Sequence, residues 1–368
     1  MNKNSDRVRK TYHWSALGYA LIIIITLVVC TMGTAMSGQD DPFQRLPLNG
    51  PTGIIVDPFG CFYVADTGNN RIMRICDPTS PNPTITRIAG TGVPGPRGDG
   101  MPATLAQLNH PVGVALDGNR NLYIADSLNN VIRMVTPGAD GVVNGEPDEI
   151  ITTIAGSLVP GCGGDNRLAQ QAQLSMPRGI VVDASGMLYI ADSLCNSLRK
   201  VDLNTGIITT VVRGLRMPSD VEEENGALYV ADTGNNRVCR VEGSGCAPVV
   251  GNGSGSFCGE GGHATRACLW NLRGIGIGLL GLYIADTFNH RIRLVTRDGI
   301  IRTIAGSGPI GPGSGDYGGD VGPATLARLN EPSDVAVDFS GNVFIADTKN
   351  NRIRWVDTNG IIRTIVGP

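Results

Sequence analysis

Three features of this 368-residue chain predict an all-β fold, a propeller of six four-stranded antiparallel blades. An aromatic–(Val/Ile)–Ala–Asp pattern recurs six times, and a period of several tens of residues indicates a circular or stacked repeat architecture. Short runs rich in β-branched residues flank each copy. The 51 glycines and 22 prolines are typical of a turn-rich protein. The six patterns end at Asp66, Asp126, Asp192, Asp232, Asp286 and Asp347.

The first copy shows how each blade is expected to form. A first strand begins at the proline of Pro51–Asp57, and Phe62–Asp66 forms the second strand. A Thr-Gly-Asn-Asn turn follows, in which Asp66 accepts backbone N–H bonds while Gly and Asn tolerate positive φ. Arg71–Ile75 and Thr84–Ile88 supply the third and fourth strands. The repeat aspartates are therefore expected to be structural turn residues.

The copies resemble NHL repeats in their proline–glycine opening, Tyr-(Val/Ile)-Ala-Asp strand and Asn-Asn-Arg-Ile turn. The resemblance covers residues 46–368 and implies a six-bladed β-propeller. It does not imply one activity, because propellers of this kind host unrelated functions. Both the first and the last repeat are expected to be complete, so closure of the ring would depend on side-chain packing between them.

The N-terminus has a different composition from the repeats. Residues 1–14 form a short basic flank, which we expect on the cytosolic side, and residues 15–36 form an apolar segment. A positive flank before such a segment directs the following chain across a membrane. The segment is either a transmembrane signal anchor, expected to be helical, or a cleaved signal peptide. After the linker 37–45, the propeller 46–368 is expected to be periplasmic or at the cell surface, or secreted if the segment is cleaved.

The charge balance argues against nucleic-acid binding. Residues 1–36 carry four basic residues and one acid, so the rest of the chain carries −6 of the net charge of −3. Nucleic-acid binding needs a positive field, which the exported part lacks.

The cysteines agree with export to an oxidising compartment. Apart from Cys30 in the apolar segment, eight cysteines remain, and eight allow 105 connectivities. The repeat register favours four local pairs, which would be structural disulfides. These candidate pairs are Cys61–Cys76, Cys162–Cys195, Cys239–Cys246 and Cys258–Cys268.

An arginine recurs directly after the turn between the second and third strands in four repeats, where it is expected to pair with turn acids and brace adjacent blades. The four are Arg71, Arg237, Arg291 and Arg352, while Val131 and Ser197 stand in this position in the second and third repeats.

Function is expected on the face where the second-to-third-strand turns and the blade-to-blade linkers emerge, which we call the loop face. Its linkers are long and unequal, and such loops on a rigid scaffold usually carry binding surfaces. Four linkers share an acid, which either stabilises a short helical turn or joins a ring of acids that binds a cationic partner or, loosely, calcium. These acids are Asp99, Asp165, Glu260 and Asp320. Three apolar residues at the turn tips are candidate partner contacts, namely Leu128, Leu194 and Phe288.

The sequence thus predicts a non-enzymatic binding or scaffolding propeller that engages a protein or glycan partner, with no cofactor and no nucleic acid. The alternative is a metal-dependent lyase at the centre of the same face, because some propellers that resemble this one are lyases with a histidine-held metal. Its candidate ligands would be His110, His263 and His290, although such histidines are more often solvated surface residues. No Ser/His/Asp grouping indicates a hydrolase.

Overall fold

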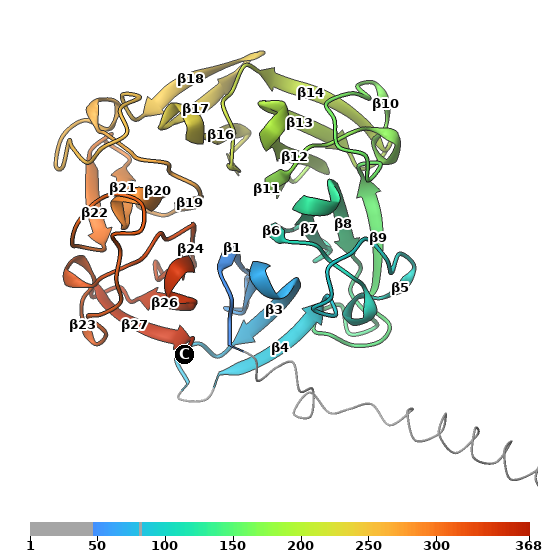
Figure 1. Cartoon of the computed structure of the whole chain (residues 1–368), viewed down its shortest axis with the longest axis horizontal. Helices are drawn as coiled ribbons and strands as arrows, with labels where there is room; N and C mark the ends of the chain where they lie inside the picture. The colour runs from blue at the N-terminus through green and yellow to red at the C-terminus, as the bar shows by residue number, and fades with distance from the viewer. Residues whose placement is uncertain (1–46, 81–82) are drawn as a thin grey trace, which may run out of the picture. The chain divides into compact units, whose positions relative to one another are not determined.

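The computed structural model describes residues 47–80 and 83–368, and within them it forms a ring of six antiparallel sheets (Figure 1). The apolar segment 15–36 and the linker 37–45 lie outside the described residues, so their predicted roles stay predictions. Among the described residues, no helix is both long and apolar enough to span a bilayer.

Blades 1, 4 and 5 are four-stranded sheets, and the strands pair in chain order from the first to the fourth. Blade 1 contains β1 (Pro51–Val56), β2 (Phe62–Asp66), β3 (Arg71–Cys76) and β4 (Thr84–Ala89). Blade 4 contains β15 (Asp220–Glu224), β16 (Ala227–Asp232), β17 (Arg237–Glu242) and β18 (Gly245–Val250). Blade 5 contains β19 (Ile275–Gly278), β20 (Gly281–Asp286), β21 (Arg291–Thr296) and β22 (Ile301–Ala305).

Blades 2, 3 and 6 each gain a fifth strand of two residues from the preceding linker, which pairs with the outermost strand. Blade 2 contains β5 (Met101–Pro102), β6 (Pro111–Leu116), β7 (Leu122–Asp126), β8 (Val131–Val135) and β9 (Ile150–Ala155). Blade 3 contains β10 (Arg167–Leu168), β11 (Pro177–Val182), β12 (Met187–Asp192), β13 (Ser197–Asp202) and β14 (Ile207–Arg213). Blade 6 contains β23 (Gly322–Pro323), β24 (Asp334–Val337), β25 (Val343–Asp347), β26 (Arg352–Val356) and β27 (Ile361–Val366).

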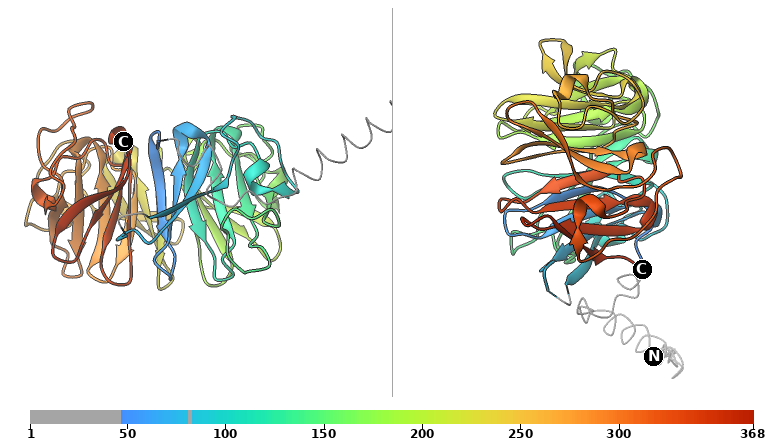
Figure 2. Two further views of the ribbon diagram at one scale, coloured as in Figure 1. Left: turned by 90° about the horizontal axis from the view of Figure 1, so that it is seen from below. Right: turned by 90° about the vertical axis from the view of Figure 1, so that its left-hand side faces the viewer.

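The described residues also contain ten short 3-10 turns. Six join the second and third strands of the blades, namely η1 (Thr67–Asn69), η3 (Ser127–Asn129), η5 (Ser193–Cys195), η6 (Thr233–Asn235), η8 (Thr287–Asn289) and η10 (Thr348–Asn350). Four lie in the linkers, namely η2 (Ala103–Leu105), η4 (Ala169–Gln171), η7 (Ala264–Arg266) and η9 (Ala324–Leu326). Figure 2 shows the ring edge-on, with the strands running between its two faces. The predicted six-bladed propeller is confirmed, and the linker strands are an addition to it.

The core is divided among the six junctions between blades, each of which contains its own hydrophobic cluster. The junction that closes the ring brings β1 and β2 against β24 and β25, with the rings of Phe62 and Phe344 5.2 Å apart. No strand is exchanged between blades 1 and 6 in the described residues. Packing of side chains across this junction therefore closes the ring, as the sequence predicted.

A hydrogen bond of the same kind crosses every junction. The residue that ends each second-to-third-strand turn is in the left-handed region, and its side chain accepts a backbone N–H from the start of the next blade. In the closing junction Asn351 Oδ1 accepts the N–H of Gly50 at 2.7 Å. Elsewhere the acceptors are Asn70, Asn130, Asn196, Asn236 and His290. We call this contact the junction clamp.

Four disulfides join the same four cysteine pairs that the repeat register favours, namely Cys61–Cys76, Cys162–Cys195, Cys239–Cys246 and Cys258–Cys268. Their sequence separations run from 7 to 33 residues, so each one fastens a hairpin or a loop within or next to one blade. Disulfides of this density are typical of a chain that folds in an oxidising compartment.

Candidate functional site

The six repeat aspartates of the loop face are fully buried. Asp66 Oδ1 accepts the backbone N–H of Asn49 at 2.8 Å, and Asp286 Oδ1 accepts that of Trp270 at the same distance. Each aspartate thus fastens the segment that leads into its own blade, whereas the sequence suggested backbone bonds within the turn. Their role in the described residues is structural.

Arginines at two different positions form ion pairs with these aspartates, and the sequence analysis identified only one of the two positions. Arg71 and Arg237, directly after the turn, pair with Asp66 and Asp232 at 2.6 and 2.8 Å within their own blades. The expectation was wrong for Arg291 and Arg352, which donate to backbone carbonyls and stack on the rings of Phe257 and Tyr317.

In blades 2, 3, 5 and 6 the turn aspartate is served by a second, fully buried arginine two residues further along the strand. These arginines are Arg133, Arg199, Arg293 and Arg354. Each also reaches the acid of the preceding linker: Arg133 Nη2 lies 2.6 Å from Asp99, and Arg354 Nη2 lies 2.6 Å from Asp320. The linker acids therefore pair with buried arginines. The expected capping of a helical turn is wrong, because no side chain caps η2, η4 or η9.

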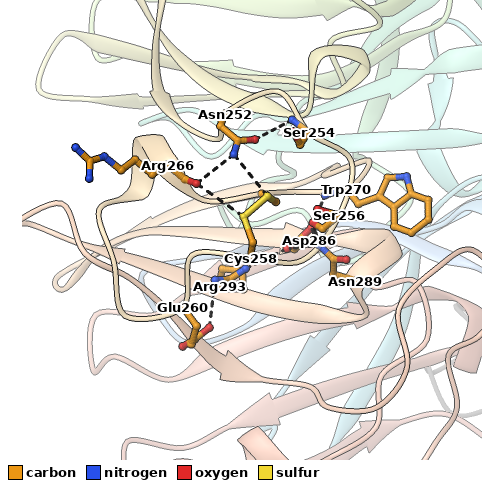
Figure 3. The surroundings of a disulfide bond; sticks show 11 residues. Asn252, Ser254, Ser256, Cys258, Glu260, Arg266, Trp270, Asp286, Asn289 and Arg293 are labelled. Carbon is orange, nitrogen blue, oxygen red and sulfur yellow. Dashed lines mark hydrogen bonds and ion pairs between the residues drawn. A yellow bond between two sulfur atoms is a disulfide. The ribbon is translucent and has the colours of Figure 1, made fainter.

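Figure 3 shows this arrangement in blade 5, where the Cys258–Cys268 disulfide braces the linker. Glu260 lies 3.2 Å from Arg293 and also accepts the backbone N–H and the hydroxyl of Thr303. The linker is thereby attached to the body of its blade. Direct contact between the linker acids and a partner stays a prediction.

The three apolar turn tips differ in exposure. Leu128 and Leu194 are 46 and 49% exposed on the adjacent blades 2 and 3. Phe288 is half-buried, because its ring packs edge-on against that of Trp270, with the ring centroids 6.0 Å apart. Phe288 therefore has a packing role that the sequence analysis did not recognise.

The three histidines have unrelated surroundings. His110 and His263 are exposed, in agreement with the expected surface position. His290 is fully buried and forms the junction clamp of blade 5: Nδ1 accepts the N–H of Glu331 at 3.0 Å, so Nε2 donates to the carbonyl of Gly311 at 2.7 Å. Within residues 47–80 and 83–368, no group of three or more His, Cys, Asp or Glu side chains is arranged to hold a metal ion.

A cavity of about 290 Å³ lies on the ring axis, at the starts of the six innermost strands. It is lined by the residues that follow the opening proline, or Leu272 in blade 5, of each first strand. These are Thr52, Val112, Arg178, Ser219, Arg273 and Ser333, together with His110 and the residues next along the strands. We call it the central pocket. The sequence analysis did not single out its two arginines, although aligning the six copies at this position would have shown them.

The hydroxyl groups of the central pocket are already hydrogen-bonded to protein. Thr52 Oγ1 lies 2.5 Å from Thr67 Oγ1, and Ser219 Oγ and Ser333 Oγ make equivalent contacts to Thr233 and Thr348. The two arginines are different, because no ion pair or hydrogen bond of their side chains is found in the described residues. The guanidinium groups are consequently the free donors of the pocket.

Burial lowers the pKa of Arg178 and of Arg273, and the charge of Arg273 lowers the pKa of Arg178 further. Partial shielding from solvent at the edge of the pocket, together with the charge of Arg178, also lowers the pKa of His110. Glu331 opposes the effect at Arg273, but its Oε1 accepts the N–H of Gly313. The pocket therefore concentrates positive charge that the protein compensates only in part.

Carboxyl groups lie at the boundary between the central pocket and a deeper cavity of about 170 Å³ on the same axis. Asp220 and Asp334 line both cavities, and each bonds the first strand of the next blade, at Ile275 and Ile54. Burial raises the pKa of Asp220 to about 7 and holds the pKa of Asp334 well above its ordinary value.

Comparison with known proteins places the repeats in a family. The family model described as the teneurin NHL domain matches residues 149–220, 220–310 and 309–368. The chain belongs to the teneurin NHL-domain family. Mouse teneurin-1 is 27% identical over 370 residues, and the match covers 88% of this chain but 13% of teneurin-1. Mouse teneurin-4 is 32% identical over 237 residues, covering 53% of this chain and 8% of the relative.

Other proteins that are similar to this chain have different names. The Arabidopsis thaliana chloroplastic protein SUPPRESSOR OF QUENCHING 1 is 27% identical over 334 residues, covering 87% of this chain and 26% of that protein. An auxiliary nutrient binding protein of Bacteroides thetaiotaomicron superposes with a TM-score of 0.61 at 15% identity, covering 86% of this chain and 70% of that one. Virginiamycin B lyase of Staphylococcus aureus superposes with a TM-score of 0.51 at 17% identity, covering 87% of this chain and 86% of that one. At such identities the likeness shows the fold alone.

Proposed function

We propose that this chain is a non-enzymatic binding propeller whose loop face engages a protein or glycan partner. The observation that carries the proposal is the group of exposed apolar residues on the linkers and turns of two adjacent blades. Blades 2 and 3 present Leu128 and Leu194 at the turn tips and Val93, Leu158 and Val159 in the linkers, all 46 to 55% exposed. Exposed apolar side chains that gather into a patch are typical of interaction surfaces, and we infer such a patch across these two adjacent blades.

The comparisons support binding only in general terms. The solved propellers of the same fold include a nutrient-binding protein and a lyase, so the fold does not decide between binding and catalysis. The separate surroundings of the three histidines favour binding over the metal-dependent lyase. Loosely bound calcium and membrane anchoring through residues 15–36 stay predictions, while the four disulfides support an extracytoplasmic position.

The test compares the two faces of the ring. We expect the purified full chain, coupled to beads, to adhere to intact cells of its source, and Leu128→Gly combined with Leu194→Gly to reduce adhesion severalfold. The matched control is Phe59→Gly combined with Phe339→Gly, at first-turn tips that are 68 and 79% exposed on the opposite face. Protease and glycosidase treatment of the cells distinguishes a protein partner from a glycan. Equal adhesion by both double variants and the parent chain would contradict the proposal.

A further inference from the structure

We propose that the central pocket binds an oxyanion group, a carboxylate or a phosphate, of a small soluble ligand between Arg178 and Arg273. This inference is separate from partner capture by the apolar residues of the loop face, and it stands if that capture fails. It is carried by the position of the two arginines on the ring axis, their lack of protein partners, and the volume that they border.

The arginines occupy equivalent positions in blades 3 and 5, on either side of blade 4. Both line the same cavity of about 290 Å³, which lies at the small end of the range for small-molecule sites. Because both side chains border this one cavity, both can face a single bound anion. Guanidinium groups present paired N–H donors that fit carboxylate and phosphate oxygens.

The contrast with the four buried arginines beneath the linkers supports a ligand. Arg133, Arg199, Arg293 and Arg354 each pair with two acids, whereas no acid lies within ion-pair distance of Arg178 or Arg273 in the described part of the chain. Arg178 and Arg273 are half-buried, so each cation has lost part of its solvent without gaining an acid, and a bound anion would offset that loss.

The carboxyl groups beside the pocket do not take the place of the anion. Asp220 Oδ1 and Oδ2 accept the backbone N–H groups of Val221 and Ile275, and Asp334 is held in the same way by Val335 and Ile54. Burial raises the pKa of both acids, that of Asp220 to about 7, so proton uptake reduces their negative charge as the pH falls. The pocket is therefore suited to an anion from outside the protein, most of all in mildly acidic solution.

The test uses calorimetric titration of the full chain with two probes, citrate for a carboxylate and inorganic phosphate, at pH 6 and constant ionic strength. We expect saturable binding of at least one probe, weakened roughly tenfold or more by Arg178→Gln and by Arg273→Gln. Arg216→Gln is the matched control, because Arg216 is an exposed arginine of the loop face outside the pocket. The probe that binds identifies the group.

A folding defect is distinguished by Arg178→Lys and Arg273→Lys, which keep the charge but lose the paired donors, and by the thermal unfolding of each variant. Weakened binding in folded Lys variants supports the proposal. It is overturned if neither probe saturates at concentrations up to about 10 mM, if binding survives both Gln substitutions, or if Arg216→Gln weakens it equally.

Discussion

Blades 1 and 2 bury the same turn aspartate but compensate it differently. In blade 1, Arg71 pairs with Asp66, and the position two residues further along is Met73. In blade 2, Val131 stands in the Arg71 position, while the buried Arg133 reaches both Asp126 and the linker acid Asp99. Blade 4 has the same arrangement as blade 1, with Arg237 and Cys239 in the two positions. Neither blade comes after one of the four linkers that carry an acid.

The difference shows that the second arginine belongs with the linker. A guanidinium buried beneath a long linker has one acid in its own blade and one in the linker, so it attaches a surface loop to the blade core. In blades 1 and 4, which lack such a linker, the arginine directly after the turn pairs with the turn aspartate. The linkers of the loop face are thus held by fully buried arginines.

The largest expected effect comes from replacing the arginine of blade 2. Arg133→Met should lower the free energy of unfolding by about 3–5 kcal/mol, because it leaves Asp126 buried without its cation. Adding Val131→Arg recreates the arrangement of blade 1 and should recover most of the loss. Urea unfolding measures both changes. A double variant as unstable as Arg133→Met alone would show that the two arginine positions are not interchangeable.

The pH dependence of stability gives a smaller effect. Burial raises the pKa of Asp126 to about 6, above its ordinary value of 3.8. The stabilisation from its proton is therefore complete below pH 3.8 and is lost as the pH rises through 6. Asp126→Asn removes this contribution, so its unfolding free energy relative to the parent chain should rise by on the order of 2 kcal/mol between pH 4 and 7.5. A constant difference between the two chains would contradict the assignment.

The smallest effects are expected at the linker acids. Asp99 is 50% exposed and contacts Arg133, whereas Asp165 is 27% exposed and contacts Arg199, Arg213 and Thr210. Asp165→Asn should cost roughly 1 kcal/mol, and Asp99→Asn less, because solvent screens exposed pairs. Thermal unfolding of the two variants measures the order, and the reverse order would show that contact number does not determine how firmly a linker is held.

The sequence was sufficient for features that every repeat shares. The strands and the turn aspartates follow from one register applied six times, and the same register placed the paired cysteines near each other. It was insufficient where the repeats differ, because the pairing of Arg133 with Asp99 joins residues 34 positions apart through a linker whose path the register does not determine. His290 was expected at the surface but is buried. The loop at Gly311 covers it, and the register does not predict the position of that loop. The proximity of Arg178 and Arg273 to one cavity could not be predicted, because it depends on how the ring places blades 3 and 5 around a common axis.

The junction clamp has a consequence for chain order. Because the bond from Gly50 to Asn351 repeats the bonds of the other five junctions, the ring has no special seam. The start of β1 and the end of β27 lie beside the same clamp, since Arg352 also donates to the carbonyl of Pro368. A circular permutant that links these two ends and opens the chain at the short connection before blade 4 would keep all six clusters. The order in which the blades are synthesised is therefore separable from the ring that they build.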